Sequence, residues 1–248
     1  MVKGLDTFQK YFADYEEQYV LIGGAACDIL FESNEVNFRA TRDLDMVLIV
    51  EALTPKFGEK IWKFIVDGKY RNKATNGSNP QFYRFDKPED DNFPKMIELF
   101  CRSDFKLKDA KGITPIHIDD EVSSLSAILL NDAYYKALLN GKEVRKDLSV
   151  LRPEYIILFK AKAYLDLKKQ KDLGEKVDSS DIKKHKKDVL RIASDLMLEK
   201  VEELPTAVDA DIHSFIDLLE QEPFDQNSLK RYGLKNEDIV ELLKQVFG

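Results

Sequence analysis

The stretch that decides the fold is residues 41–50, TRDLDMVLIV, which begins with polar residues and ends in an unbroken apolar run. A continuous apolar run of this length is typical of a central strand that is covered on both faces of its sheet. Its polar beginning is expected at the edge of the sheet. Because alternate side chains of a strand share one face, Asp43 and Asp45 are expected to point the same way. They would then be close enough to coordinate one divalent cation between them.

A second unit of strand, turn and helix precedes this stretch. Residues 19–22, YVLI, predict a short buried strand, and Gly23-Gly24 end it before a helix of small residues that runs to about Phe31. Glycine allows a phosphate to approach the backbone closely, and the unpaired amides at the start of a helix attract anions. The turn is therefore a candidate phosphate site, with a tight turn that binds nothing as the alternative.

A third apolar strand, MIELFC at residues 96–101, is interrupted by one carboxylate, Glu98. An ionised carboxylate is costly in apolar surroundings unless a metal, a cation or water reaches it. If a neighbouring strand brings Glu98 beside Asp43 and Asp45, the three carboxylates could hold two divalent cations. The alternatives are a solvated turn for the two aspartates and an exposed sheet edge for Glu98.

The rest of the chain predicts an α+β fold class with a mixed sheet, flanking helices and a mainly helical C-terminal lobe. Pro153 suits the first turn of a helix, and Ser180 is a candidate N-cap. We expect one domain at residues 1–150 and a second at 151–248. The expected helices are 5–17, 56–67, 133–140, 153–170, 180–199, 210–221 and 235–247; 80–86 is a further strand, and 113–131 is strand and connection.

Composition narrows the classes of function. Hydrophobic residues make up 44% and charged residues 33%, as in folded, water-soluble proteins. No apolar run approaches the roughly 20 residues that span a bilayer, and the start, MVKGLDTFQKYF, lacks the apolar core of a signal peptide. A net charge of −7 argues against a protein that coats nucleic acid indiscriminately. We expect a cytoplasmic protein without a membrane partner, whose Cys27 and Cys101 are buried, reduced thiols.

The motifs together resemble a known superfamily. Gly23-Gly24-Ala25-Ala26, a gap, and then Arg39-x-Thr41-x-Asp43-x-Asp45 is similar to the nucleotidyltransferase superfamily that includes DNA polymerase beta. Within it the chain looks most like the AbiEii-type nucleotidyltransferases, whose members include toxins of bacterial toxin–antitoxin and phage-defence systems. The resemblance is strongest over residues 19–50 and around 153–195. It departs at Arg42, a bulky cation next to the expected metal site.

The resemblance implies a role for each motif residue. Asp43, Asp45 and Glu98 would be catalytic and would bind Mg²⁺ or Mn²⁺. A lysine and an aspartate on successive helices of the second half would also be catalytic, and these look like Lys160 and Asp188. The nucleotide-binding residues would be Gly23, Gly24, Arg39, Thr41 and Lys160.

Helical spacing gives Lys160 apolar neighbours and so makes it more enclosed than Lys162, although either could contact phosphate. Asp188 falls at the edge of an apolar stripe, where it could orient the incoming group, act as a base or form an ordinary ion pair. The basic segment of Lys183, Lys184, Lys186 and Lys187 could contact a nucleic-acid acceptor or nucleotide phosphates, or could be merely solvated.

These expectations lead to a metal-dependent nucleotidyltransferase. It would move a nucleotidyl group from a nucleoside triphosphate to a hydroxyl of RNA, protein or a small molecule and release pyrophosphate. The resemblance also implies a toxin role and a cognate antitoxin protein. The alternatives are a non-catalytic module for nucleotide sensing or partner binding, and an antibiotic-type nucleotidyltransferase that acts on small molecules.

Overall fold

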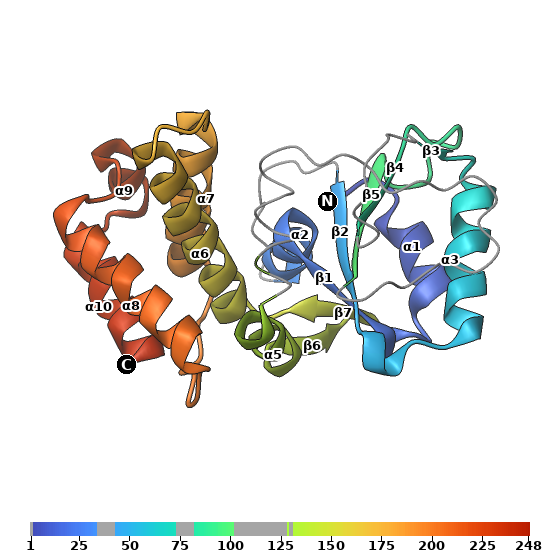
Figure 1. The fold of residues 1–248 in the computed structure, drawn as a ribbon, viewed down its shortest axis with the longest axis horizontal. Coiled ribbons are helices and arrows are strands. Elements are labelled where there is room, and N and C mark those ends of the chain that lie inside the picture. The colour runs from blue at the N-terminus through green and yellow to red at the C-terminus, as the bar shows by residue number, and fades with distance from the viewer. Residues whose placement is uncertain (1, 34–42, 73–81, 102–127, 129–130) are drawn as a thin grey trace. The chain divides into compact units, whose positions relative to one another are not determined.

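The computed structural model describes residues 2–33, 43–72, 82–101, 128 and 131–248. It has an α+β fold, in which the first part of the chain forms a mixed sheet with flanking helices (Figure 1). Within these residues the sheet has the strand order β3-β4-β5-β2-β1-β7-β6. The central strand β2 runs antiparallel to β1 and parallel to β5. The strands are β1 (Tyr19–Ile22), β2 (Asp43–Leu48), β3 (Arg71–Asn72), β4 (Phe82–Asp86), β5 (Met96–Cys101), β6 (Lys142–Arg145) and β7 (Leu148–Leu151).

The chain forms two compact units. One comprises Met1–Asp119 with Lys142–Leu151, and the other comprises Asp120–Gly141 with Arg152–Gly248. The helix at residues 132–140 thus belongs to the second unit. The domain boundary after residue 150 stays a prediction. The first unit contains α1 (Leu5–Phe12), α2 (Gly23–Ser33) and α3 (Pro55–Asp67); the second contains α5 (Asp132–Asn140), α6 (Pro153–Asp172), α7 (Ser179–Asp195), α8 (Thr206–Gln221), α9 (Gln226–Tyr232) and α10 (Asn236–Phe247).

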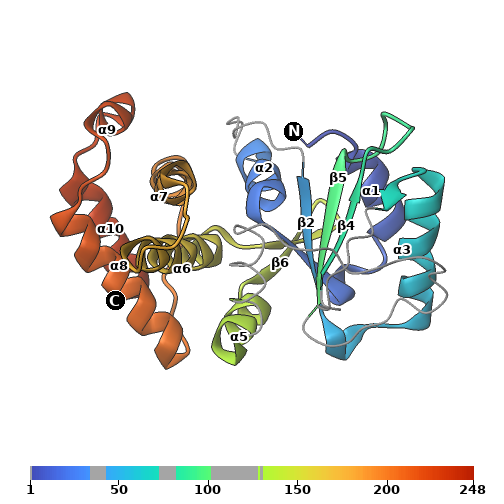
Figure 2. The same ribbon diagram turned by 45° about the horizontal axis from the view of Figure 1, so that its top comes forward.

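Helices cover both faces of the sheet, with α2 on one face and α1 and α3 on the other (Figure 2). Tyr19 of β1 marks the second face, because its ring meets those of Phe8 and Phe12 at centroid distances of 5.6 and 6.2 Å. Phe57 and Phe64 complete this aromatic core, in which all five rings are buried. Burying each such side chain stabilises the fold by about 1.5–3 kcal/mol, so this cluster fixes α1 and α3 on the sheet.

The strand register assigns faces to the acidic residues. Tyr19 pairs with Leu48 and Leu21 pairs with Met46, so those even-numbered residues of β2 face α1 and α3. Alternation then places Asp43 and Asp45 on the opposite face, which α2 covers. The apolar core on one side and the helix on the other explain why β2 is buried from Met46 to Leu48.

Several predicted elements agree with the structure, and others differ from it in their bounds or their N-cap. Strands β1 and β5 match their predicted bounds, whereas the first helix ends at Phe12 rather than continuing to residue 17. Asp178, not Ser180, is the N-cap of α7, because its carboxylate accepts a hydrogen bond from the Ser180 amide at 2.8 Å. The predicted segment 113–131 lies almost entirely outside the described residues. The additional strands and α-helix of the described residues are β3, β6, β7 and α9, all shorter than eight residues.

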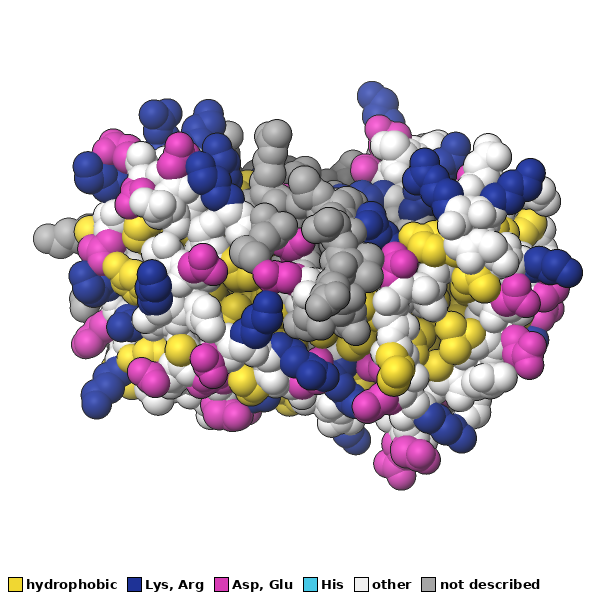
Figure 3. Space-filling model, turned by 180° about the vertical axis from the view of Figure 1, so that it is seen from behind, with side chains coloured by type: hydrophobic (Ala, Val, Ile, Leu, Met, Phe, Trp, Pro, Cys, Tyr) yellow, Lys and Arg dark blue, Asp and Glu magenta, His cyan; other side chains and the backbone are white. Residues whose placement is uncertain are grey.

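Two further expectations concern cysteines and membranes. Cys27 is a reduced, fully buried thiol, as expected, and the side chain of Cys101 lies outside the described residues. Every helix of the described residues is too short or too polar to cross a bilayer. On the face shown in Figure 3, lysine and arginine side chains are interspersed with aspartates and glutamates.

In the second unit, α6 packs against α7 and α8, and α8 packs against α10. At the first turn of α6, Glu154 is buried, and its Oε1 accepts a hydrogen bond of 2.6 Å from the amide of Glu199. Burial raises the pKa of Glu154, against the opposing effect of this backbone hydrogen bond. The folded protein therefore keeps the proton on Glu154 to a higher pH than the unfolded chain does.

This difference predicts a pH dependence of stability. A carboxyl whose pKa is raised by folding makes the free energy of unfolding fall as pH rises from its ordinary pKa toward its raised one. Glu154→Gln keeps the acceptor for the Glu199 amide but cannot ionise, so the variant should lose less stability than the original between pH 5 and pH 8. Urea unfolding across this range measures both slopes. Equal slopes would contradict the raised pKa.

Candidate functional site

A row of charged side chains crosses the centre of the sheet on the face that α2 covers. Asp45 of β2 pairs in register with Glu98 of β5, which pairs in register with Arg84 of β4. Asp43 stands two residues before Asp45 on the same face, where both are partly exposed. The sheet thus brings Asp43, Asp45 and Glu98 onto one face of two adjacent strands, as residue alternation and the apolar strands predict.

Glu98 is buried and paired. Its Oε1 accepts a hydrogen bond of 2.6 Å from Nε of Arg84 and forms a salt bridge of 2.6 Å with Nη2, and its side chain is only 8% exposed. Burial, followed by the negative charge of Asp45, raises the pKa of Glu98 to about 8, although Arg84 opposes the rise. Asp45 and Glu98 together therefore carry less than two full negative charges at neutral pH.

Arg84 is the residue at this site that the sequence analysis did not identify. It is the only basic residue of FYRFD, a strand that also ends in Asp86, and a charge between aromatic residues is the same kind of signal that identified Glu98. A cation and an anion on neighbouring strands are expected to pair, because each compensates the desolvation cost of the other. The sequence therefore indicates that Arg84 needs an acidic partner, and the pairing of β4 with β5 identifies that partner as Glu98.

The Gly23 turn lies directly against Asp45. Ile22 pairs with Asp45 in the sheet, and α2 begins at the next residue, Gly23. Gly23 has φ of +60°, and a Cβ built on it would lie 2.3 Å from Oδ2 of Asp45. A side chain at position 23 would therefore have to displace the carboxylate from the first residue of α2, where the helix dipole favours negative charge. Gly24 follows as the second residue of this helix.

The donor chemistry at this face fits a hard divalent cation. Mg²⁺ prefers oxygen ligands and is commonly held by one or two carboxylates together with water and substrate phosphates. Asp43 and Asp45 supply two such carboxylates on one face. In the described residues no three His, Cys, Asp or Glu side chains are grouped to hold a metal, consistent with the pairing of Glu98 to Arg84. The assignment of metal ligands stays a prediction.

Two predicted nucleotide-binding residues, Arg39 and Thr41, lie outside the described residues, as does Arg42. Lys160 and Asp188 belong to the second unit, where Nζ of Lys160 lies 3.0 Å from Oδ2 of Asp188. Their side chains are 11% and 5% exposed, so this is a buried ion pair rather than the surface pair that the sequence left open.

Lys162 makes different contacts, which separate it from Lys160. Its Nζ lies 2.9 Å from Asp166 and 3.3 Å from Asp211, and its side chain is 23% exposed. Asp211 also accepts a hydrogen bond of 2.9 Å from the hydroxyl of Tyr134, so Lys162 belongs to a polar network that joins α5, α6 and α8. Lys160 is the more enclosed of the two, as helical spacing predicts.

Comparisons with known proteins add little. No protein-family model matches the chain, and no curated protein matches it. The chain is similar to the crystal structure of an antigenic nucleotidyltransferase-like protein from Paracoccidioides brasiliensis, with a TM-score of 0.45 and 15% identity over 97% of this chain and 93% of the other. A similarity at this level does not establish a family.

Replacement of Gly23 tests the contact with Asp45. Gly23→Ala introduces a methyl group where the Asp45 carboxylate lies and forces a left-handed backbone on a residue with a Cβ. We expect a loss of about 2 kcal/mol of unfolding free energy, measured by urea denaturation. Gly58→Ala is the matched control on α3, where a new Cβ meets nothing within 4 Å; it should be neutral or stabilising by up to about 1 kcal/mol. Equal stability of Gly23→Ala and the original chain would contradict the geometry.

The Lys160–Asp188 pair predicts non-additive substitutions. Asp188→Leu or Lys160→Met alone deprives the remaining buried charge of this partner and should cost about 3–5 kcal/mol of unfolding free energy. The double variant removes both charges and should regain most of that loss. A double-mutant cycle by chemical denaturation measures the coupling. Additive losses, or single losses below about 1 kcal/mol, would show that the pair is not buried as described.

Proposed function

We propose that this chain is a metal-dependent nucleotidyltransferase, which transfers a nucleotidyl group from a nucleoside triphosphate to an acceptor hydroxyl and releases pyrophosphate. The observation that carries the proposal is the position of the Asp45 carboxylate. It lies beside Asp43 on one sheet face, in register with Glu98 and against the first residue of α2. This places acidic side chains and a helix N-terminus at one point, the chemistry that a metal-bound triphosphate requires.

Asp43 and Asp45 would hold Mg²⁺ or Mn²⁺. The cation would supply charge neutralisation at the phosphates and a lower pKa for an attacking hydroxyl. Glu98 would complete the acidic set through its position beside Asp45, with Arg84 holding its carboxylate in place. A proton and a metal cation would compete for these carboxylates. Burial and the charge of Asp45 raise the pKa of Glu98, so without a cation the site holds only a limited negative charge.

The α2 N-terminus would receive the phosphates of the nucleotide. Gly23 and Gly24 allow the backbone of the first helical turn to approach an anion closely. Arg39 and Thr41, which the resemblance assigns to nucleotide binding, would add a cation and a hydroxyl near the same acidic strand. These four roles, like the metal site, are proposals.

Lys160 and Asp188 would act from the second unit. A buried lysine whose ammonium already sits 3.0 Å from a carboxylate is held in one orientation, which suits binding of a triphosphate oxygen. Asp188 would orient Lys160 or position the incoming group. Because Lys160 and Asp188 stabilise each other, their catalytic role must be tested in variants whose folding has been measured separately.

The finer proposals follow from the sequence resemblance alone. They are an AbiEii-type activity, use of magnesium, a toxin role with a cognate antitoxin, and a cytoplasmic site of action on RNA, protein or a small-molecule acceptor. The antibiotic-type alternative shares the same metal site and differs in its acceptor. Incubation with each labelled nucleoside triphosphate, magnesium and a cell extract, followed by identification of the labelled molecule, distinguishes these acceptors.

One observation favours a second candidate, a non-catalytic nucleotide-sensing or partner-binding module. The Arg84 guanidinium contacts Oε1 of Glu98, so fewer carboxylate oxygens remain to bind a cation. A module of this kind would bind nucleotide without a divalent ion and would form no pyrophosphate. Calorimetric titration of a nucleoside triphosphate with and without Mg²⁺, together with a pyrophosphate assay, separates the two candidates.

Asparagine substitutions test the proposed activity. Asp43→Asn and Asp45→Asn keep the side-chain shape but remove the anionic ligands, so each should lower nucleotide transfer by at least about a thousandfold, or about 4 kcal/mol. The measurement is incorporation of label from the triphosphate that the intact protein uses.

The matched control is Asp14→Asn, at an exposed position outside the acidic face, which should keep full activity. Circular dichroism and urea unfolding confirm that each variant is folded. Undiminished transfer by Asp45→Asn, or transfer that persists in excess chelator, would refute the proposed mechanism.

A further inference from the structure

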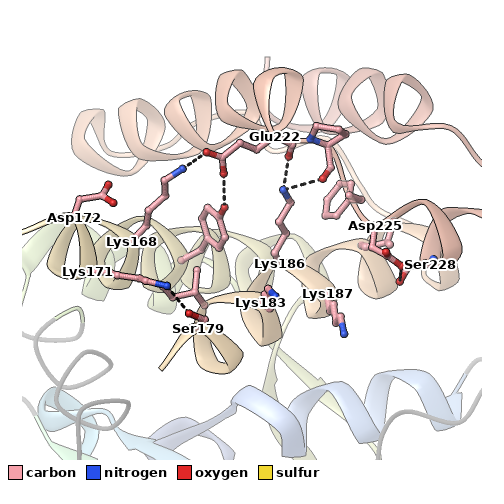
Figure 4. A pocket seen from close by; sticks show the side chains of 15 residues that line it. Lys168, Lys171, Asp172, Ser179, Lys183, Lys186, Lys187, Glu222, Asp225 and Ser228 are labelled. Carbon is pink, nitrogen blue, oxygen red and sulfur yellow. Dashed lines mark hydrogen bonds and ion pairs between the residues drawn. The ribbon is translucent and has the colours of Figure 1, made fainter. Parts of the chain in front are cut away.

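A second candidate site lies in the helical unit, in a cavity of about 740 Å³ bordered by α6, α7 and the segment that joins α8 to α9 (Figure 4). This volume is within the range of about 300–1,000 Å³ that is typical of small-molecule sites. Its lining includes neither Lys160 nor Asp188 and belongs wholly to the second unit. The cavity is therefore a site distinct from the residues assigned to nucleotide transfer.

Lysines dominate the charge of this cavity. The basic residues that line it are Lys168, Lys171, Lys183, Lys186 and Lys187, against Asp172, Glu222 and Asp225. The local excess is positive, although the whole chain carries a net charge of −7. Ammonium groups that line one cavity repel one another, so an anion that enters between them relieves an unfavourable interaction.

Two of the three acids are already engaged by the protein. Glu222 accepts hydrogen bonds from Lys168 and from the hydroxyl of Tyr164, the latter at 3.1 Å. Asp225 caps α9 and accepts from the amide and hydroxyl of Ser228 at 2.9 and 3.0 Å. These contacts fix the carboxylates at the cavity wall and leave the positive charge of the lysines incompletely balanced.

Lys186 has a structural role in the wall. Its ammonium donates to the backbone carbonyls of Glu222 and Pro223 and lies over the rings of Tyr164 and Phe224, 5.8 and 5.4 Å from their centroids. Burial lowers the pKa of Lys186, and the positive charge of Lys168 adds to this effect while Glu222 opposes it. Lys186 thus closes one side of the cavity and is poorly placed to move toward a ligand.

Lys183 and Lys187 are the lysines free to bind. They are exposed, lie four residues apart on α7 and so share one helical face, and neither forms a salt bridge with a described carboxylate. Lys187 also lines an adjoining cavity of about 350 Å³ together with Arg191 and Arg231. The basic lining therefore continues along α7 toward α9.

We propose that this cavity binds a small molecule that carries two or more phosphate groups. Lysine ammonium groups are compact charges that bind phosphate well, and here they come from both α6 and α7, so they can reach more than one phosphate. Ile182 and Leu190 add apolar lining for an organic portion of the ligand. A partly open cavity of about 740 Å³ has the size of a small-molecule site, whereas an extended nucleic-acid strand needs a longer groove.

Calorimetric titration with inorganic tripolyphosphate tests the proposal on the full-length chain in the presence of chelator, which prevents metal-dependent binding. Lys183→Gln/Lys187→Gln removes two charges without breaking a described ion pair and should weaken binding at least tenfold. The matched control is Lys169→Gln/Lys176→Gln, which removes two exposed charges of the same region outside the cavity lining and should change the affinity less than twofold. Asp43→Asn/Asp45→Asn should bind tripolyphosphate as the original chain does.

Four results would overturn the proposal. They are absence of tripolyphosphate binding by the original chain, unchanged binding by Lys183→Gln/Lys187→Gln, an equal loss in the two lysine variants, and loss of binding in Asp43→Asn/Asp45→Asn. A single-stranded oligonucleotide that displaces tripolyphosphate and binds far more tightly would also overturn it and would assign the cavity to nucleic acid. The chelator excludes divalent ions, so absence of tripolyphosphate binding would not bear on the proposed transferase activity. Absence of transferase activity would likewise not bear on this binding prediction.

Discussion

The contact on which the candidate site depends is that between the Asp45 carboxylate and the first residue of α2. A carboxylate on a central strand needs space, a favourable field or a counter-charge, because its desolvation is otherwise costly. Gly23 provides the space by lacking a Cβ that would lie 2.3 Å from Oδ2 of Asp45, and the start of the helix provides the field. The sheet register brings the two groups together, since Ile22 pairs with Asp45 and α2 begins at the next residue.

The same register governs the electrostatics next to this contact. Glu98 pairs with Asp45 on one side and with Arg84 on the other, so it experiences both a like charge and an opposite charge across neighbouring strands. Burial and Asp45 prevail over Arg84, which is why the pKa of Glu98 rises to about 8. Because Glu98 keeps its proton to a higher pH, the acidic face carries less negative charge before a cation binds. This property suits reversible binding of a metal with its substrate.

The sequence predicted the parts of the site that depend on local pattern. Apolar runs located β1, β2 and β5, and alternation placed Asp43 and Asp45 on one face. The pairing of Glu98 with Arg84 depends on which strands are neighbours, which a run of residues such as FYRFD does not specify. The hairpin of β6 and β7 escaped prediction because its turn residues, Lys146 and Asp147, adopt positive φ without the glycine that usually marks such a turn. The burial of Asp188 likewise depends on tertiary packing, since its position in the helical pattern lies at the edge of the apolar stripe.

The central claim is that Asp43 and Asp45 hold a divalent cation with a triphosphate, and Mn²⁺ binding followed by electron paramagnetic resonance tests it most directly. With a non-hydrolysable nucleoside triphosphate present, the intact chain should remove Mn²⁺ from solution, whereas Asp45→Asn should leave most of it free at the same protein concentration. Equal Mn²⁺ binding by the intact chain and Asp45→Asn would contradict the account.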